Sequence, residues 1–156
     1  MDAPRSDAFI FFGATGDLVH KELFPALQGL VRDNALDVPL IGVARSPWTT
    51  DQLIDRAKDS LEKSGRFDAA AFEKLAARLH YVSGDYGATE TYTRIRQALG
   101  GAQRPLLYMA VPPSVFPVVT DALTASGCAK HARVIIEKPF GRDLASAQEL
   151  NRVLRG

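Results

Sequence analysis

The chain has 156 residues, of which 46% are hydrophobic and 24% are charged, with a formal net charge of +1. This composition is that of an ordinary globular protein, and the length favours a single domain spanning residues 1–156. The balanced charge argues against a general nucleic-acid or membrane-surface role, and no apolar run approaches the roughly 20 residues of a membrane span. The polar amino terminus does not resemble a secretion signal, and the single cysteine, Cys128, fits a reducing cytoplasm as a structural thiol.

Short apolar runs alternate with longer amphipathic stretches, which is typical of βαβ units. The predicted strands cover residues 8–12, 39–44, 80–83, 106–111 and 133–137. The predicted helices cover residues 17–32, 49–63, 69–79, 88–99, 114–126 and 143–154. Near-continuous apolar strands indicate a sheet that is buried on both faces. We therefore expect an α/β fold: an open, doubly wound, Rossmann-type sheet, mostly parallel, with helices on both faces.

The helix boundaries carry recognisable signals. Pro25 inside the first helix predicts a kink or a lost hydrogen bond. Thr49 or Thr50 is expected to cap the second helix, and Ser114 the helix at 114–126, which Gly127 should end.

The segment after the first strand reads Gly13-Ala-Thr-Gly16-Asp17-Leu18. Gly13 permits a tight turn, and Gly16 removes a side chain where a pyrophosphate would approach a helix N-terminus. Asp17 stands where a carboxylate favours the helix dipole. This segment predicts a nucleotide site; the alternative is a strand-to-helix turn that binds nothing.

The second strand is followed by Arg45 and Ser46 and by no acidic residue. NAD sites usually place Asp or Glu there for the ribose 2′-hydroxyl, whereas an arginine suits the 2′-phosphate of NADP. Thr15 is a further candidate from the first loop. We expect NADP to be preferred over NAD; the alternative is an exposed loop arginine.

Two more candidates come from the fourth and fifth strands, whose ends are each followed by proline. Lys138 follows the fifth strand, where a lysine can hold a phosphate or hydroxyl. Tyr108 lies in the fourth strand and is alternatively a core tyrosine.

Four motifs occur in an order that resembles the glucose-6-phosphate dehydrogenase family, in its N-terminal NADP-binding domain. They are Gly13-Ala-Thr-Gly16-Asp17-Leu18, Gly42-Val-Ala-Arg45-Ser46, Tyr108-Met-Ala-Val-Pro112-Pro113 and Glu137-Lys138-Pro139-Phe140-Gly141-Arg142. The resemblance covers nearly the whole chain. It implies oxidation of glucose 6-phosphate to a lactone, with hydride passing to NADP as the entry step of the pentose phosphate route. It implies cofactor contacts at Gly13, Ala14, Thr15, Gly16, Asp17, Leu18, Arg45, Ser46, Tyr108 and Lys138, with Lys138 also contacting the substrate, and no metal.

The family's catalytic histidine is expected outside this chain. His20, His80 and His131 match none of the family's catalytic positions and are interpreted as structural or surface residues. We expect the isolated chain to be inactive, the protein to be cytoplasmic, and the family's full-length enzyme to be a homo-oligomer. A stand-alone NADP-binding or interaction module is the first alternative. A domain like that of the glucose–fructose oxidoreductases is the second, although that group normally carries a GxGxxG loop.

Overall fold

The computed structural model describes residues 6–33, 36–127 and 133–136. Its five strands form one sheet in the order β3-β2-β1-β4-β5, and every pairing is parallel. The strands are β1 (Ala8–Phe12), β2 (Leu40–Ala44), β3 (Leu79–Ser83), β4 (Pro105–Met109) and β5 (Arg133–Ile136). The prediction of a doubly wound α/β sheet is confirmed, and β1 lies at its centre.

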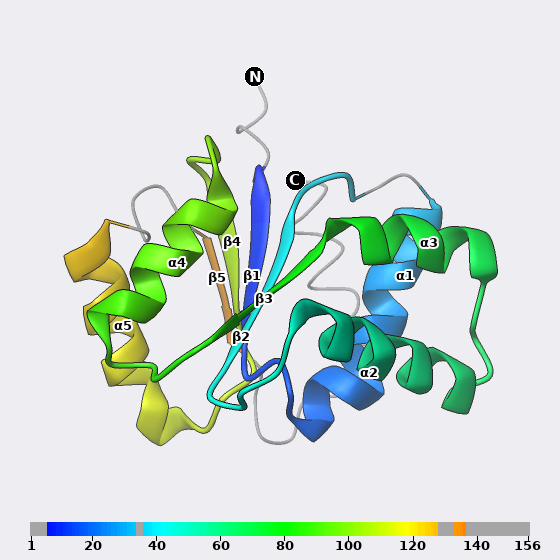
Figure 1. Ribbon diagram of the computed structural model, residues 1–156, viewed down its shortest axis with the longest axis horizontal. Coiled ribbons are helices and arrows are strands. Elements are labelled where there is room, and N and C mark those ends of the chain that lie inside the picture. Colours follow the sequence, from blue (N-terminus) through cyan, green and yellow to red (C-terminus); the bar gives the residue numbers. More distant parts are fainter. Residues whose placement is uncertain (1–5, 34–35, 128–132, 137–156) are drawn as a thin grey trace.

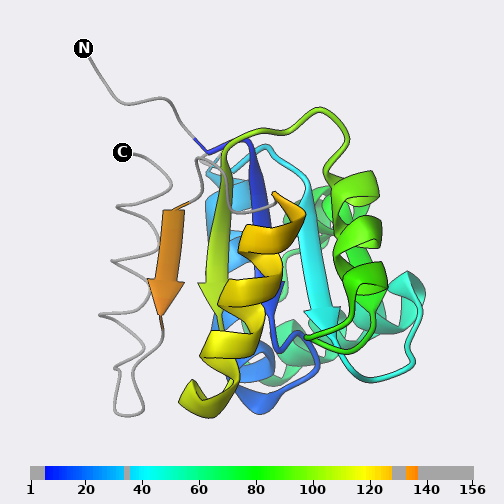
Figure 2. The ribbon, with the colours of Figure 1, turned by 90° about the vertical axis from the view of Figure 1, so that its left-hand side faces the viewer.

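Helices cover both faces of the sheet (Figures 1 and 2). One layer holds α1 (Phe24–Arg32), α2 (Thr50–Lys63) and α3 (Ala69–Arg78), and the other holds α4 (Thr89–Leu99) and α5 (Phe116–Ser126). The helix expected at residues 143–154 and Glu137 of the expected fifth strand lie outside the described residues.

The residues of β1 alternate between two hydrophobic cores. Phe9 and Phe11 belong to the core beneath α1, α2 and α3, whereas Ile10 and Phe12 belong to the core beneath α4 and α5. All five residues of β1, β2 and β4 are buried, as expected of parallel strands that are covered on both faces. This rigid centre fixes the loop that follows β1.

The first helix differs from a regular α-helix in the way that Pro25 predicts. A π-helical turn, η1 (Val19–Leu23), precedes α1, and the N–H of Phe24 donates to the carbonyl of Val19. The next π-type bond, to the carbonyl of His20, would need an N–H on Pro25, which proline lacks. The hydroxyl of Ser60 on α2 donates to this carbonyl instead.

Two of the expected caps have different outcomes. Thr49 caps α2 through a capping box: the Gln52 N–H donates to Thr49 Oγ1 at 3.2 Å, and the Thr49 N–H donates to Gln52 Oε1 at 2.8 Å. Ser114 is not the cap of α5, so that prediction was wrong. It lies in a 3-10 turn, η2 (Pro113–Val115), and α5 begins without a side-chain cap. Pro117 in the first turn has no N–H, so this helix has one fewer free donor to satisfy.

Candidate functional site

The carboxyl end of β1 leads into the glycine loop, residues 13–18. Gly13 has a φ of +86°, and its N–H donates to the carbonyl of Val43 at 2.9 Å. The N–H of Ala14 donates to the same carbonyl at 3.1 Å, and that of Gly16 donates to the carbonyl of Gly13 at 3.0 Å. The loop is therefore a tight turn tied to β2, as Gly13 predicts.

The residues of the glycine loop differ in exposure. Ala14 is fully buried, and a Cβ at Gly42 of β2 would lie 2.9 Å from its Cβ. Gly16 and Asp17 are exposed, and Leu18 is half-buried. Gly16 therefore faces solvent at the start of the helical segment, and its cofactor contact stays a prediction.

The loop after β2 lies against the glycine loop. The hydroxyl of Thr15 is 3.0 Å from that of Ser46, and Arg45 beside it is exposed. The carbonyl of Ser46 accepts from the Tyr81 hydroxyl at 2.6 Å and from the Trp48 N–H at 2.8 Å. The structure thus brings together Thr15 and Ser46, which the sequence places 31 residues apart, beside an exposed arginine.

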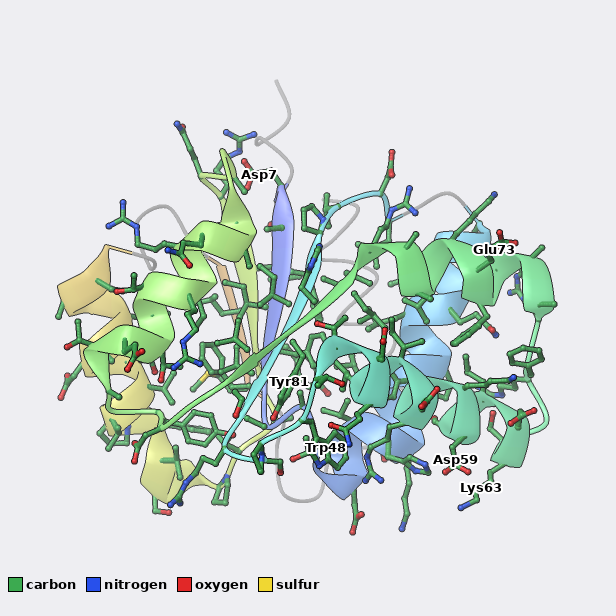
Figure 3. The ribbon with its side chains drawn as sticks, viewed as in Figure 1. Asp7, Trp48, Asp59, Lys63, Glu73 and Tyr81 are labelled. Atoms are coloured by element: carbon green, nitrogen blue, oxygen red, sulfur yellow. The ribbon has the colours of Figure 1, made fainter. Side chains whose placement is uncertain are left out.

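Three further side chains meet here that the sequence did not single out. Trp48 packs against Tyr81 with ring centroids 6.4 Å apart, and Figure 3 shows the two beside each other. The guanidinium carbon of Arg56 on α2 lies 5.7 Å from the centroid of the Trp48 ring. Burial raises the pKa of Tyr81 to about 12, so its hydroxyl remains a hydrogen-bond donor at neutral pH. The stacked side chains of Trp48, Tyr81 and Arg56 support the loop after β2.

Tyr86, in the loop after β3, also lies at the carboxyl ends of the strands. Its ring packs edge-on against Phe12 at the end of β1, with a centroid separation of 6.3 Å. Burial raises the pKa of the Tyr86 hydroxyl, while a hydrogen bond from the Gly13 backbone and the positive charge of Arg45 oppose that rise. Loops from three neighbouring strands therefore converge at one place.

Of the two remaining predicted site residues, Tyr108 is buried and Lys138 lies outside the described residues. Tyr108 is only 2% exposed and pairs with Phe11 in the sheet, with its ring 6.1 Å from that of Phe9. This is the environment of the core tyrosine that the sequence left as an alternative, and its cofactor contact stays a prediction. Lys138 lies outside the described residues, so its two contacts stay predictions as well.

The two described histidines have different surroundings. His20 Nε2 is 2.8 Å from Asp59 Oδ2, which joins η1 to α2, and Lys63 Nζ is 3.2 Å from the same oxygen. These bonds lower the pKa of Asp59, that from His20 most strongly. His80 is exposed on the edge strand β3. Both positions fit structural or surface residues; His131 lies outside the described residues.

The part of the chain that the structure describes shows neither a metal-binding cluster nor a membrane-spanning helix. Within residues 6–33, 36–127 and 133–136, no group of three or more His, Cys, Asp or Glu side chains is arranged to hold a metal ion. None of the helices in these ranges is both long enough and apolar enough to cross a bilayer.

A central parallel strand, a glycine turn and a helical segment directly after it define a doubly wound α/β domain of the dinucleotide-binding class. Comparison with known proteins agrees. The family model for the "Glucose-6-phosphate dehydrogenase, NAD binding domain" matches residues 10–156. The chain belongs to this family and is its NAD(P)-binding domain.

Individual relatives show the same likeness. "Glucose-6-phosphate 1-dehydrogenase 1" of Mycobacterium bovis is 42% identical over 150 residues, which cover 96% of this chain and 32% of that protein. The Caenorhabditis elegans "Glucose-6-phosphate 1-dehydrogenase" is 39% identical over 160 residues, which cover 92% of this chain and 30% of that protein. The chain thus spans about a third of the length of these relatives.

Solved structures extend the comparison to the fold. The crystal structure of glucose-6-phosphate 1-dehydrogenase from Mycobacterium avium has a TM-score of 0.83 and 45% identity, over 97% of this chain and 34% of that one. A glucose-6-phosphate dehydrogenase solved with glucose 6-phosphate has a TM-score of 0.77 and 34% identity, and the match covers 98% of this chain and 35% of that one. The fold is therefore that of the family's nucleotide-binding domain.

Proposed function

We propose that this chain is the NADP-binding domain of an enzyme that oxidises glucose 6-phosphate to 6-phosphoglucono-lactone. Family membership and the names of the relatives support this reaction, in which the hydride passes to the nicotinamide. Binding of a nicotinamide cofactor belongs to the family's domain; the choice of NADP and the complete reaction are the proposal.

The observation that carries the choice of NADP is Arg45. It follows β2, where an acid would accept hydrogen bonds from a free ribose 2′-hydroxyl, and its side chain is exposed beside Thr15 and Ser46. A guanidinium offers a planar fork of donors to a phosphate, and the two hydroxyls add neutral donors. The 2′-phosphate of NADP fits this group better than a bare hydroxyl does.

Glucose 6-phosphate is the proposed substrate, with Lys138 as its contact in this chain. A general base must reach the proton that it removes. His20 joins η1 to α2 through Asp59, His80 lies on the edge strand β3, and neither matches a catalytic position that the family resemblance implies. We propose that the residues of this chain bind cofactor and part of the substrate, and that the isolated 156-residue domain forms no measurable NADPH.

Localisation and assembly follow the relatives. Two Arabidopsis thaliana relatives are named as cytoplasmic enzymes, which supports a cytoplasmic location. A homo-oligomeric full-length enzyme stays a prediction from the family resemblance.

Calorimetric titration of the 156-residue protein with NADP, NAD and glucose 6-phosphate tests the proposal. We expect NADP to bind at least tenfold more tightly than NAD, and Arg45→Gln to remove most of that difference, since one charge-assisted phosphate contact is worth roughly a factor of ten or more. Equal binding of the two cofactors to the unmodified protein would contradict NADP preference. Glucose 6-phosphate-dependent NADPH formation by this protein would show that a catalytic base is present in it.

A further inference from the structure

Arg56 on α2 contacts both loops of the candidate cofactor site. Its Nη2 is 3.8 Å from Asp17 Oδ1 in the glycine loop, and its guanidinium lies over Trp48 in the loop after β2. Asp17 is two residues beyond Thr15, and Trp48 is two residues beyond Ser46. Arg56 therefore contacts each loop two residues away from the Thr15 and Ser46 hydroxyls, which are 3.0 Å apart.

The Arg56 side chain is held in place by its neighbours. It stacks on Trp48, Trp48 packs on Tyr81, and the Tyr81 hydroxyl donates to the carbonyl of Ser46. The side chain is 26% exposed. A guanidinium that is already stacked loses little conformational freedom when it binds an anion. The cluster therefore presents a preorganised cation.

The hydrogen-bonding capacity of Arg56 is largely unused within the described residues. Its Nε is buried without a hydrogen-bond partner there. Its one ion pair there, at 3.8 Å, joins it to the carboxylate of Asp17, whose side chain is 89% exposed. A pair at this distance, with its carboxylate in solvent, contributes little, so an anion can replace Asp17 as the partner of Arg56 at small cost.

We propose that Arg56 is a second arginine of the 2′-phosphate site and determines specificity together with Arg45. A phosphate monoester carries about −1.5 to −2 charges at pH 7, so a single arginine leaves part of that charge uncompensated. Arg45 follows β2, and Arg56 reaches the same two loops from α2 through Asp17 and Trp48. This inference rests on the proposed preference for NADP.

The test compares ligands that differ by the 2′-phosphate. NADP, NAD, 2′-AMP and 5′-AMP are titrated into the unmodified protein and into Arg56→Gln, Arg56→Lys and Arg45→Gln. The matched control is Arg66→Gln, an exposed arginine beyond the far end of α2. Circular dichroism and thermal melting check that each variant is folded.

For Arg56→Gln we expect NADP and 2′-AMP to bind about tenfold more weakly, while NAD and 5′-AMP change less than twofold. Arg56→Lys should restore part of the loss, because it keeps the charge without the planar fork. The dependence of NADP affinity on salt concentration should also become shallower in Arg56→Gln. Arg66→Gln should bind all four ligands as the unmodified protein does.

Two results would overturn the role of Arg56. One is an equal loss for NADP and NAD, which would mean that Arg56 only supports Trp48; the other is no loss for any ligand. Failure of the proposed function has a different signature: the unmodified protein would bind NAD as tightly as NADP, and Arg45→Gln would change neither. If Arg45→Gln removes the discrimination and Arg56→Gln keeps it, NADP preference stands and the inference on Arg56 falls.

Discussion

Gly13 and Ala110 lie so close that a Cβ atom at position 13 would be 2.2 Å from the carbonyl oxygen of Ala110. Ala110 directly follows β4, the strand that pairs with β1. The glycine at this position is therefore required by the packing of the protein itself. The absence of a side chain at Gly13 lets the two central strands end side by side, with or without a ligand.

Gly13→Ala should lower the free energy of unfolding by about 3 kcal/mol, from the strain of a positive φ and the overlap with Ala110. Gly65→Ala is the matched control: it has a φ of +73°, but nothing lies within 4 Å of its Cβ. It should lose only about 1 kcal/mol. Urea unfolding of both variants measures the difference, and equal losses would mean that the contact with Ala110 relaxes freely.

The contact between Ser60 and the His20 carbonyl predicts a second stability effect. Ser60 is 3% exposed and supplies the donor that Pro25 lacks. Ser60→Ala should lower the free energy of unfolding by about 1–2 kcal/mol, because the part-buried carbonyl of His20 loses its partner. Ser64→Ala is the control, since its hydroxyl donates at the exposed end of α2 and its loss should be under about 0.5 kcal/mol. Chemical denaturation that ranks the two serines the other way would contradict this account of the π-helical turn.

Removal of the cap of α2 should also be measurable. Thr49→Ala removes the Oγ1 acceptor of the Gln52 N–H, whereas the backbone N–H at position 49 keeps its bond to Gln52 Oε1, and the change should lower the free energy of unfolding by about 1 kcal/mol. Thr49→Ser keeps the hydroxyl and should behave nearly as the unmodified protein does. Thermal melting of the pair gives the comparison; identical melting temperatures for Ala and Ser would mean that the cap adds nothing.

Asp7 predicts a pH dependence. Its carboxylate accepts hydrogen bonds from the N–H groups of Gln103 at 2.8 Å and Arg104 at 2.6 Å. These bonds lie at the amino ends of the strands, opposite the candidate site (Figure 3). Partial burial raises the pKa of Asp7, but these bonds and the charge of Arg104 outweigh it, so the pKa lies below its ordinary value of 3.8. The bonds therefore stabilise the fold above about pH 5, and that contribution is lost as the pH falls through the folded-state pKa.

Asp7→Asn should accordingly lower the free energy of unfolding by about 1 kcal/mol at pH 6 and by less at pH 3. Urea unfolding of both proteins across this range checks the sign. A difference that stays constant with pH would show that the charge of Asp7 contributes nothing.

Local signals in the sequence predicted the structure where the deciding contacts are local. The β1 boundaries, the Thr49 cap and the Gly127 helix end, with a φ of +80°, depend on neighbours within a few residues. Pro25 indicated a disturbance in the helix but not its form, because the π-helical turn is completed by Ser60 on another helix.

The parts that could not be predicted depend on contacts between distant segments. Arg56 carries no motif of its own. Its place in the candidate site comes from its packing on Trp48, which in turn packs on Tyr81 of β3. Ser114 was expected as a cap from its own side chain, whereas Pro117 and the 3-10 turn decide how α5 begins. For Tyr108, the strand pattern indicated burial and the family resemblance indicated a ligand contact, and the two pointed in different directions.

The π-helical turn at Val19–Leu23 also determines how the glycine loop is rotated relative to α1. A π-turn holds one residue more than an α-turn, and each residue of an α-helix turns the chain by about 100°. In a regular α-helix one additional residue would therefore rotate Asp17 and Leu18 by about 100° relative to α1. The π-turn accommodates the additional residue within one turn, so the glycine loop stays in phase with a helix whose apolar side is fixed against the sheet.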